Sequence, residues 1–332
     1  MVALLSPSIG EATAGMAASS SISGSSAVSA CAAMAFFYVA ILYSPTLIFR
    51  LPPPTSLESF LIRRFVCAIV SSIASVIATS ILLGLGRLEV VSQILGVFGV
   101  RGDHLLQAVV IPLLLTSLLY AGSLVFKLWL LIDSWRGDCR VSSCRRVGSY
   151  ERVGIYARKC IAWISSRACD VMAWRNYVVA PFTEELVFRA CMIPLLLCGG
   201  FKIYNIIFFS PVFFSLAHLN HFLELRYWQG YDLWKAFLIV GLQLGYTVAF
   251  GWYASFLFTR TGNVMSPIVA HIFCNVMGLP VLSASRTRGL ATIAFAAGFV
   301  GFFWLLFPAT TPDIYNNRKD GCSCWHGYCY WE

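Results

Sequence analysis

Charged side chains are scarce in this chain, and acidic ones are the scarcest. Asp, Glu, Lys and Arg make up 12% of the 332 residues and only 15 residues are acidic, whereas 58% of the chain is hydrophobic. So few charges cannot cover the surface of an ordinary soluble domain. The mean hydropathy of +0.75 and the repeated apolar runs of about 20 residues instead predict an all-α, polytopic membrane protein.

Several familiar signatures are also missing. The chain has no His-Glu-x-x-His sequence, the mark of a common class of zinc proteases. Residues 1–29 contain no Lys or Arg, so they lack the basic start of a secretory signal and are predicted to be a disordered, Ser/Ala-rich leader. The 12 cysteines are scattered through apolar runs and basic loops, which does not fit a disulfide framework. What remains is one membrane-embedded unit, 30–307, and a Cys- and aromatic-rich tail, 308–332.

Basic residues outnumber acidic ones by 24 to 15, which gives a net charge of +9. They concentrate in the loops between apolar runs, above all in the polar segment 133–175. This pattern is typical of cytosolic loops beside anionic lipid and not of a nucleic-acid-binding surface. We therefore expect the lipid bilayer, and no nucleic acid, as a partner.

The apolar runs predict about eight transmembrane helices. An even number puts both termini on one side of the membrane and the basic loops on the other, which the positive-inside rule makes cytosolic. The third run is long enough that it must tilt or project from the bilayer. The expected spans are 30–49, 65–85, 105–132, 176–198, 203–219, 236–258, 264–282 and 289–307.

Two adjacent carboxylates, Glu184 and Glu185, interrupt the apolar run 176–198 together with Arg189. Ionisable groups inside such a run are costly unless they pair or face a water-filled cavity, so they mark a functional site. On a helix Glu185 and Arg189 share a face, whereas Glu184 points about 100° away. We expect Arg189 to neutralise Glu185 and to leave Glu184 free for chemistry. The alternative is a purely structural ion-pair cluster that holds helices together.

Polar side chains of catalytic type also occur in two later apolar runs. His218 and His221 are three residues apart near the end of the run 203–219, and His271 and Asn275 are four apart within the run 264–282. Each pair therefore lies on roughly one helix face. Three runs that each contribute such groups are hard to explain by packing alone. A curved cavity that opens to the cytosol would bring them together.

Two reaction mechanisms need this set of residues. In one, Glu184 activates a water with help from His218, and His271 and Asn275 donate hydrogen bonds to the tetrahedral oxyanion. In the other, the Glu and His side chains bind a zinc ion that activates the water. A transporter with a proton-relay Glu and His set is the main alternative of another class.

Three stretches resemble, in order, the motifs of the eukaryotic type II CAAX prenyl endopeptidases, within the wider family of CAAX proteases and bacteriocin-processing enzymes. The first is Glu184-Glu-x-x-x-Arg189, inside Arg175–Pro194. The second is Phe213-Phe-Ser-Leu-Ala-His-Leu-Asn-His-Phe222, and the third is Phe256–Pro280. The first motif is moderately specific alone, but the three in order are highly specific. They define a motif core at 175–280.

The resemblance implies an eight-span intramembrane glutamate protease of the endoplasmic reticulum, with a catalytic cavity open to the cytosol. Such an enzyme removes the last three residues of prenylated CAAX proteins, small GTPases among them. It works without a metal, so no cofactor is expected, and zinc is the alternative. A family member that retains the fold only as a scaffold is a further alternative.

The resemblance also implies a role for each polar residue of the motifs. By position, these roles are water activation for Glu184 and His218, the oxyanion site for His271 and Asn275, and support for Glu185, Arg189 and His221.

Overall fold

The computed structural model describes residues 22–85, 91–141, 154, 158, 161–162, 165–217, 219–282, 287 and 289–315. These residues form helices joined by short connections and no strand occurs among them, which confirms the all-α prediction. The α-helices outside the first motif are α1 (Gly24–Ala40), α2 (Ser44–Leu47), α3 (Leu57–Leu82), α4 (Val91–Val97), α5 (Leu105–Leu119), α6 (Ala121–Val141), α11 (Ile203–Ala217), α12 (Asn220–Leu223), α13 (Leu233–Thr261), α14 (Met265–Met277) and α15 (Leu290–Leu306), and short helical turns are η1 (Ile41–Tyr43), η6 (Glu224–Trp228), η8 (Pro308–Thr310) and η9 (Pro312–Ile314).

The segment that carries the first motif is one continuous run of helical turns in which α-helical pieces alternate with wider π-helical ones. Pro181 and Pro194 cannot donate the backbone hydrogen bonds that would reach four residues back, which disturbs the regular α-helical ladder. Wide turns of this kind are frequent at functional sites. The pieces are α8 (Val171–Trp174), η4 (Arg175–Val179), α9 (Ala180–Glu185), η5 (Leu186–Cys191) and α10 (Met192–Cys198).

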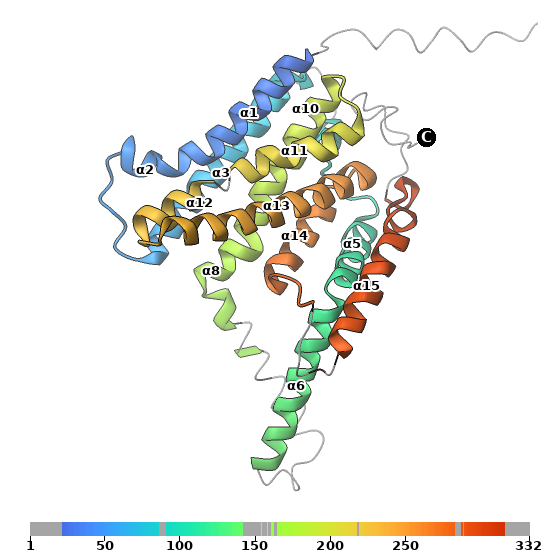
Figure 1. Cartoon of the computed structure of the whole chain (residues 1–332). Coiled ribbons are helices and arrows are strands. Elements are labelled where there is room, and N and C mark those ends of the chain that lie inside the picture. Colours follow the sequence, from blue (N-terminus) through green and yellow to red (C-terminus); the bar gives the residue numbers. More distant parts are fainter. Residues whose placement is uncertain are drawn as a thin grey trace, which may run out of the picture.

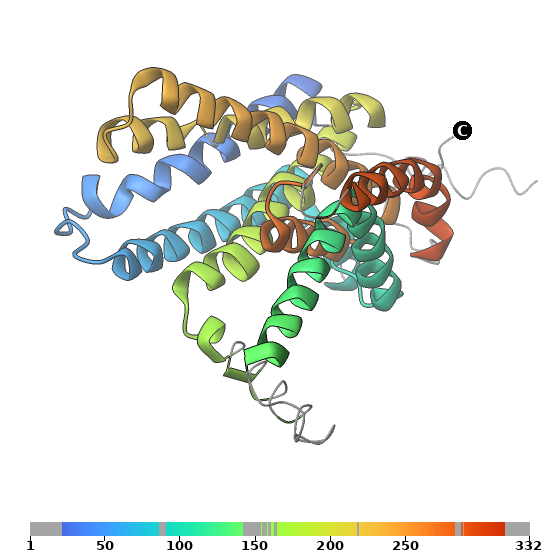
Figure 2. The same ribbon diagram turned by 60° about the horizontal axis from the view of Figure 1, so that its bottom comes forward.

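The other helices surround this motif segment. α3 packs on η5 and α9, while α14 contacts η4 and α9. α11 lies against α13, and α15 packs on α5 and α6. In both ribbon views the C-terminal part of α6 extends away from the remaining described helices (Figures 1 and 2). The first and third motifs, far apart in the sequence, thus meet at the contact of α9 with α14.

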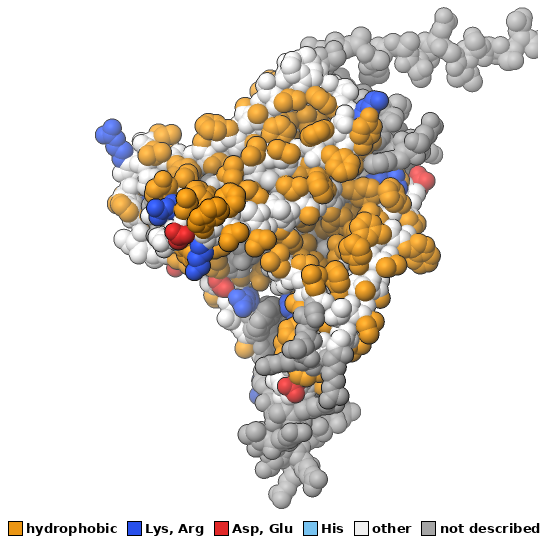
Figure 3. Space-filling model, in the orientation of Figure 1, with side chains coloured by type: hydrophobic (Ala, Val, Ile, Leu, Met, Phe, Trp, Pro, Cys, Tyr) orange, Lys and Arg blue, Asp and Glu red, His pale blue; other side chains and the backbone are white. Residues whose placement is uncertain are grey.

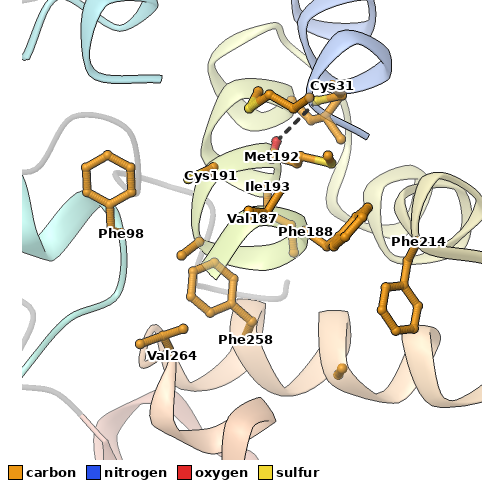
Figure 4. Close-up of a cluster of buried hydrophobic side chains, with 14 of the residues drawn as sticks. Cys31, Phe98, Val187, Phe188, Cys191, Met192, Ile193, Phe214, Phe258 and Val264 are labelled. Carbon is orange, nitrogen blue, oxygen red and sulfur yellow. Dashed lines mark hydrogen bonds between the residues drawn. The ribbon is translucent and has the colours of Figure 1, made fainter. Parts of the chain in front are cut away.

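The side chains of η5 and of the first turns of α10 form the centre of the buried core. Figure 4 shows Phe188 and Met192 enclosed by Cys31 of α1, Phe214 of α11 and Phe258 of α13. The Cys31 thiol donates a hydrogen bond to the Met192 carbonyl, with 3.8 Å between sulfur and oxygen. Since close-packed interiors permit little displacement, this packing fixes the position of the glutamate pair at the end of α9.

Among the described residues, three helical stretches are long and apolar enough to cross a membrane: Gly24–Leu47, Leu57–Leu82 and Leu233–Thr261. The pair α5 and α6 makes a fourth if it counts as one span. α11, α14 and α15 are apolar but shorter, and the 15 residues of α11 rise only about 22 Å, against roughly 30 Å of hydrocarbon. The chain is a membrane-embedded, multi-pass protein, but these helices do not establish the predicted number of eight spans.

The outer surface supports contact with lipid. Hydrophobic side chains are spread widely over the described part of the face drawn in Figure 3. Large apolar side chains are strongly exposed on α13 and α15, where Trp234, Leu242 and Trp304 are each more than 70% exposed. Apolar patches of this size need a covering, and acyl chains provide one.

The predicted third span, 105–132, is not one continuous helix. The helix breaks at Tyr120, and α5 and α6 meet there at an angle of 82°. The Tyr120 hydroxyl is hydrogen-bonded to Tyr246 of α13 and donates to the Gly278 carbonyl, both at 2.9 Å. At Gly122 a Cβ would lie 2.7 Å from the Ala291 carbonyl oxygen, so α6 can pass α15 only because this residue is a glycine. The bend therefore depends on contacts with distant segments that hydropathy does not report.

Candidate active site

Glu185 and Arg189 form a buried ion pair on the motif segment. Arg189 Nη1 donates to Glu185 Oε1 at 3.1 Å, and the two side chains are 1% and 0% exposed, respectively. The spacing of four residues predicts this pair, and the structure confirms it. The Arg189 guanidinium also lies over the rings of Phe214, at 4.5 Å, and Phe250, at 5.7 Å. These aromatic faces compensate part of the free energy that burying the charge requires.

His271 of α14 joins the two glutamates. Its Nδ1 lies 2.8 Å from Glu185 Oε1, and its Nε2 lies 3.9 Å from Glu184 Oε2. An ionised carboxylate can only accept, so His271 Nδ1 carries the hydrogen of the shorter contact. The ring of Phe250 packs against the imidazole, with 4.8 Å between the ring centroids. The imidazole is therefore held between two carboxylates, with its Nε2 edge turned toward Glu184.

Glu184 has quite different surroundings from its neighbour. Its side chain is 16% exposed, whereas that of Glu185 is fully buried. Glu184 makes no hydrogen bond to any residue that the structure describes. It lines a cavity of about 100 Å³ whose wall comes from α1, α3, η4, α9, η5 and α11, and from Leu42 just after α1. A carboxylate that faces a cavity and has no hydrogen bond to the described residues is available to bind water or substrate.

The cavity wall includes polar residues to which the sequence analysis assigned no catalytic or binding role. Tyr38 of α1 shares a hydrogen bond of 2.9 Å with Thr183, the residue before Glu184. Arg64 of α3 and Arg175 of η4 also line this cavity. In the sequence Arg64 stands out only as a basic residue of a loop, Arg175 only begins the stretch that carries the first motif, and no motif points to Tyr38. The packing of α1 and α3 on the motif segment brings Tyr38 and Arg64 to the site, whereas Arg175 belongs to that segment.

Asn275 lies one turn beyond His271 on α14, and its side chain is exposed. Its Nδ2 donates to the Asn176 carbonyl at 2.8 Å. This bond ties the end of α14 to η4 and occupies one of the two amide hydrogens. Asn275 does not belong to the described wall of the Glu184 cavity.

The two histidines of the second motif cannot be placed. His218 lies outside the described residues. The backbone of His221 belongs to α12, but its side chain lies outside the described part. Their predicted roles therefore stay predictions.

No group of three His, Cys, Asp or Glu side chains that could hold a metal ion occurs in the part of the chain that the structure describes. The zinc alternative needs Glu and His ligands together, and His218 is outside that part. The choice between the two mechanisms therefore depends on experiment.

Comparison with known proteins identifies the family. A family model described as type II CAAX prenyl endopeptidase Rce1-like matches residues 169–277. The chain is 54% identical to CAAX prenyl protease 2 of Arabidopsis thaliana, across 94% of this chain and 98% of the relative. It is 33% identical to CAAX prenyl protease 2 of Homo sapiens, across 87% and 83%. It is 30% identical to a probable CAAX prenyl protease 2 of Schizosaccharomyces pombe, across 75% and 81%.

No solved structure matches the chain. The match of the family model covers the glutamate pair, Arg189 and His271, the residues that meet around the cavity. Together with relatives that share nearly the full length, this match shows that the chain belongs to the type II CAAX prenyl endopeptidase family.

Proposed function

We propose that this chain is an intramembrane endopeptidase that removes the C-terminal tripeptide from prenylated CAAX proteins, with Glu184 as the general base. Membership of the family and the names of the relatives support the reaction. One observation carries the mechanism. Of two adjacent carboxylates, Glu185 is occupied by Arg189 and His271, whereas Glu184 faces a cavity without a hydrogen bond to the described residues.

Glu184 is suited to take a proton from a water molecule. The 3.9 Å between Glu184 Oε2 and His271 Nε2 is too long for a direct hydrogen bond, but one water can contact both atoms. Glu184 removes a proton from this water, and the oxygen attacks the carbonyl carbon of the prenylated cysteine. Glu184 then returns the proton to the leaving amine of the tripeptide. By its motif position, His218 assists the first step.

His271 is suited to stabilise the oxyanion of the tetrahedral intermediate. Its Nδ1–H is already committed to Glu185, so donation from Nε2 requires both ring nitrogens to carry hydrogen. The imidazolium then lies between the carboxylates of Glu184 and Glu185. Asn275, with one amide hydrogen still available, is the second donor in this mechanism.

The prenyl group has a suitable place next to the cavity. A groove of about 670 Å³ is lined by α1, α11 and α12 and shares Val39 and Ala217 with the Glu184 cavity. Apart from Tyr43, every described lining residue is Ala, Val, Leu or Phe. Such a volume is within the usual range for ligand pockets, and an isoprenoid chain needs no polar partner. A chain that lies in this groove would bring its cysteine close to Glu184.

We further propose that the whole chain crosses the endoplasmic reticulum membrane eight times, with the cavity open to the cytosol. The basic loops support this orientation. Substrates made in the cytosol, such as prenylated small GTPases, would reach the site from that side, while the prenyl chain would enter from the bilayer.

The test is release of the tripeptide from a farnesylated CAAX peptide by the purified full-length protein. Glu184→Gln keeps the size of the side chain but removes the base, so we expect kcat to fall by roughly 10²–10⁴-fold. Glu58→Gln is the matched control, because Glu58 is an exposed carboxylate at the start of α3 and should leave kcat unchanged. Undiminished turnover by the Glu184 variant would remove this residue from the mechanism.

The same assay with a strong chelator separates the two ways of activating water. We expect turnover to survive chelation. If the chelator abolished turnover and zinc restored it, the glutamates and histidines would instead be metal ligands. Absence of cleavage by the folded wild-type protein would favour a scaffold or transporter.

A further inference from the structure

The Glu184 cavity contains more positive charge than the reaction uses. Arg64 and Arg175 line its wall, and Glu184 is its only acidic residue among those described. With Glu184 ionised, the described wall thus carries two positive charges and one negative. Both arginines are half-buried. A buried cation is costly unless an anion is close to it, so an anion that enters the cavity would stabilise the Arg175 guanidinium.

Arg175 has neither a hydrogen bond nor an ion pair in the described part of the chain. Other arginines nearby are engaged: Arg189 binds Glu185, Arg167 binds Asp170 at 3.1 Å, and Arg63 donates to the Pro52 carbonyl at 2.7 Å. The Arg175 guanidinium is therefore available to a ligand in the cavity.

Arg64 lies where the Glu184 cavity meets a second one. Together with Leu42 it lines both the Glu184 cavity and a neighbouring cavity of about 250 Å³. Its guanidinium lies over the Phe60 ring, at 4.4 Å from the centroid, which limits its orientations. Three extended residues span about 10 Å. A tripeptide whose first residue lies at Glu184 must therefore extend beyond the Glu184 cavity, past Arg64 and toward the neighbouring cavity.

We propose that Arg64 and Arg175 bind the C-terminal carboxylate of the substrate and thereby set the distance from the chain end at which the peptide bond is cut. The inference rests on the proposed endopeptidase function and adds the residues that read the chain end. Arginine forms paired hydrogen bonds with a carboxylate in a fixed plane, which gives position as well as attraction. Among CAAX peptides with different side chains, the free carboxylate is a feature that all share.

The test compares two farnesylated CAAX peptides that differ only at the end, one with a free carboxylate and one with a carboxamide. With the wild-type protein we expect kcat/KM to be roughly 10- to 100-fold higher for the acid, the usual effect of a charge-assisted hydrogen bond. Arg175→Gln and Arg64→Gln should each lower the value for the acid toward that for the amide, mainly through KM. Both variants should lower cleavage of the amide much less than cleavage of the acid, because the carboxamide carries no charge, and the cleavage that remains shows that they are folded.

Arg167→Gln is the matched control. It removes a positive charge from the same basic segment, but Arg167 is paired with Asp170 and does not line the cavity. It should keep the full preference for the acid. An unchanged ratio of acid to amide in both cavity variants would overturn the inference, as would equal cleavage of the two peptides by the wild-type protein. Failure of the wild-type protein to cleave either peptide would overturn the proposed function and this inference with it.

Discussion

Glu184 and Glu185 are neighbours in the chain, yet only one of them is held by the protein. Glu185 Oε1 accepts from both Arg189 and His271. Its other oxygen, Oε2, and Arg189 Nη2 are buried without a hydrogen-bond partner among the described residues. Such an incompletely satisfied pair adds little to stability, but removing one partner leaves a bare charge in the core. The pair therefore serves to position His271, and losing either partner would lower the stability of the fold strongly.

This leads to a prediction at the level of one side chain. Arg189→Leu leaves the Glu185 carboxylate buried beside a single partner, His271, so we expect the free energy of unfolding to fall by about 3–5 kcal/mol. Thermal unfolding in detergent micelles would measure the loss. Arg167→Leu is the control, because its ion pair with Asp170 is partly exposed and should be worth less than about 1 kcal/mol. Equal stability of the two variants would contradict the importance of the buried pair.

At the level of helices, α15 approaches α5 so closely that one position of α15 has room only for a glycine. A Cβ at Gly298 would collide with the Leu118 carbonyl oxygen and lie 2.8 Å from the Ala121 Cβ. Gly301, one turn further along the same helix, would place its Cβ at an ordinary 3.9 Å from Leu118 Cδ1. Small residues that allow helix backbones to approach are a common device in membranes, where lipid removes the hydrophobic drive for association.

These two glycines give a matched pair of substitutions. Gly298→Ala forces α15 away from the bend between α5 and α6, so we expect a destabilisation of roughly 1–3 kcal/mol. Gly301→Ala should be neutral or stabilise by up to about 1 kcal/mol, because alanine favours the helix and finds space. Thermal unfolding in detergent would compare them. If both variants were equally stable, the close approach of α15 to α5 would be wrong.

At the scale of the whole molecule, the sequence predicts local geometry well and long-range contacts poorly. The pairing of Glu185 with Arg189 follows from a spacing of four residues on one helix. The contact of Glu185 with His271 joins residues 86 positions apart, and no spacing rule predicts it. The break at Tyr120 likewise depends on Tyr246 and Gly278, so an apolar run that reads as one span becomes two helices. The hydropathy of a segment indicates that it is buried in lipid or protein, but it does not indicate which other segments contact it and cause a bend.

The number of spans is the property of the whole molecule that most needs a measurement. With eight spans, the tail after 307 lies in the lumen and the basic segment 133–175 lies in the cytosol. Glycosylation reports the lumenal side directly, and the chain has no Asn-x-Ser/Thr acceptor of its own. We expect an acceptor added after Glu332 to be modified in endoplasmic reticulum membranes, and one inserted after Arg146 to stay unmodified. The untagged chain is the control. Modification of the Arg146 acceptor, or none at the tail, would contradict the eight-span arrangement and with it a cavity that opens to the cytosol.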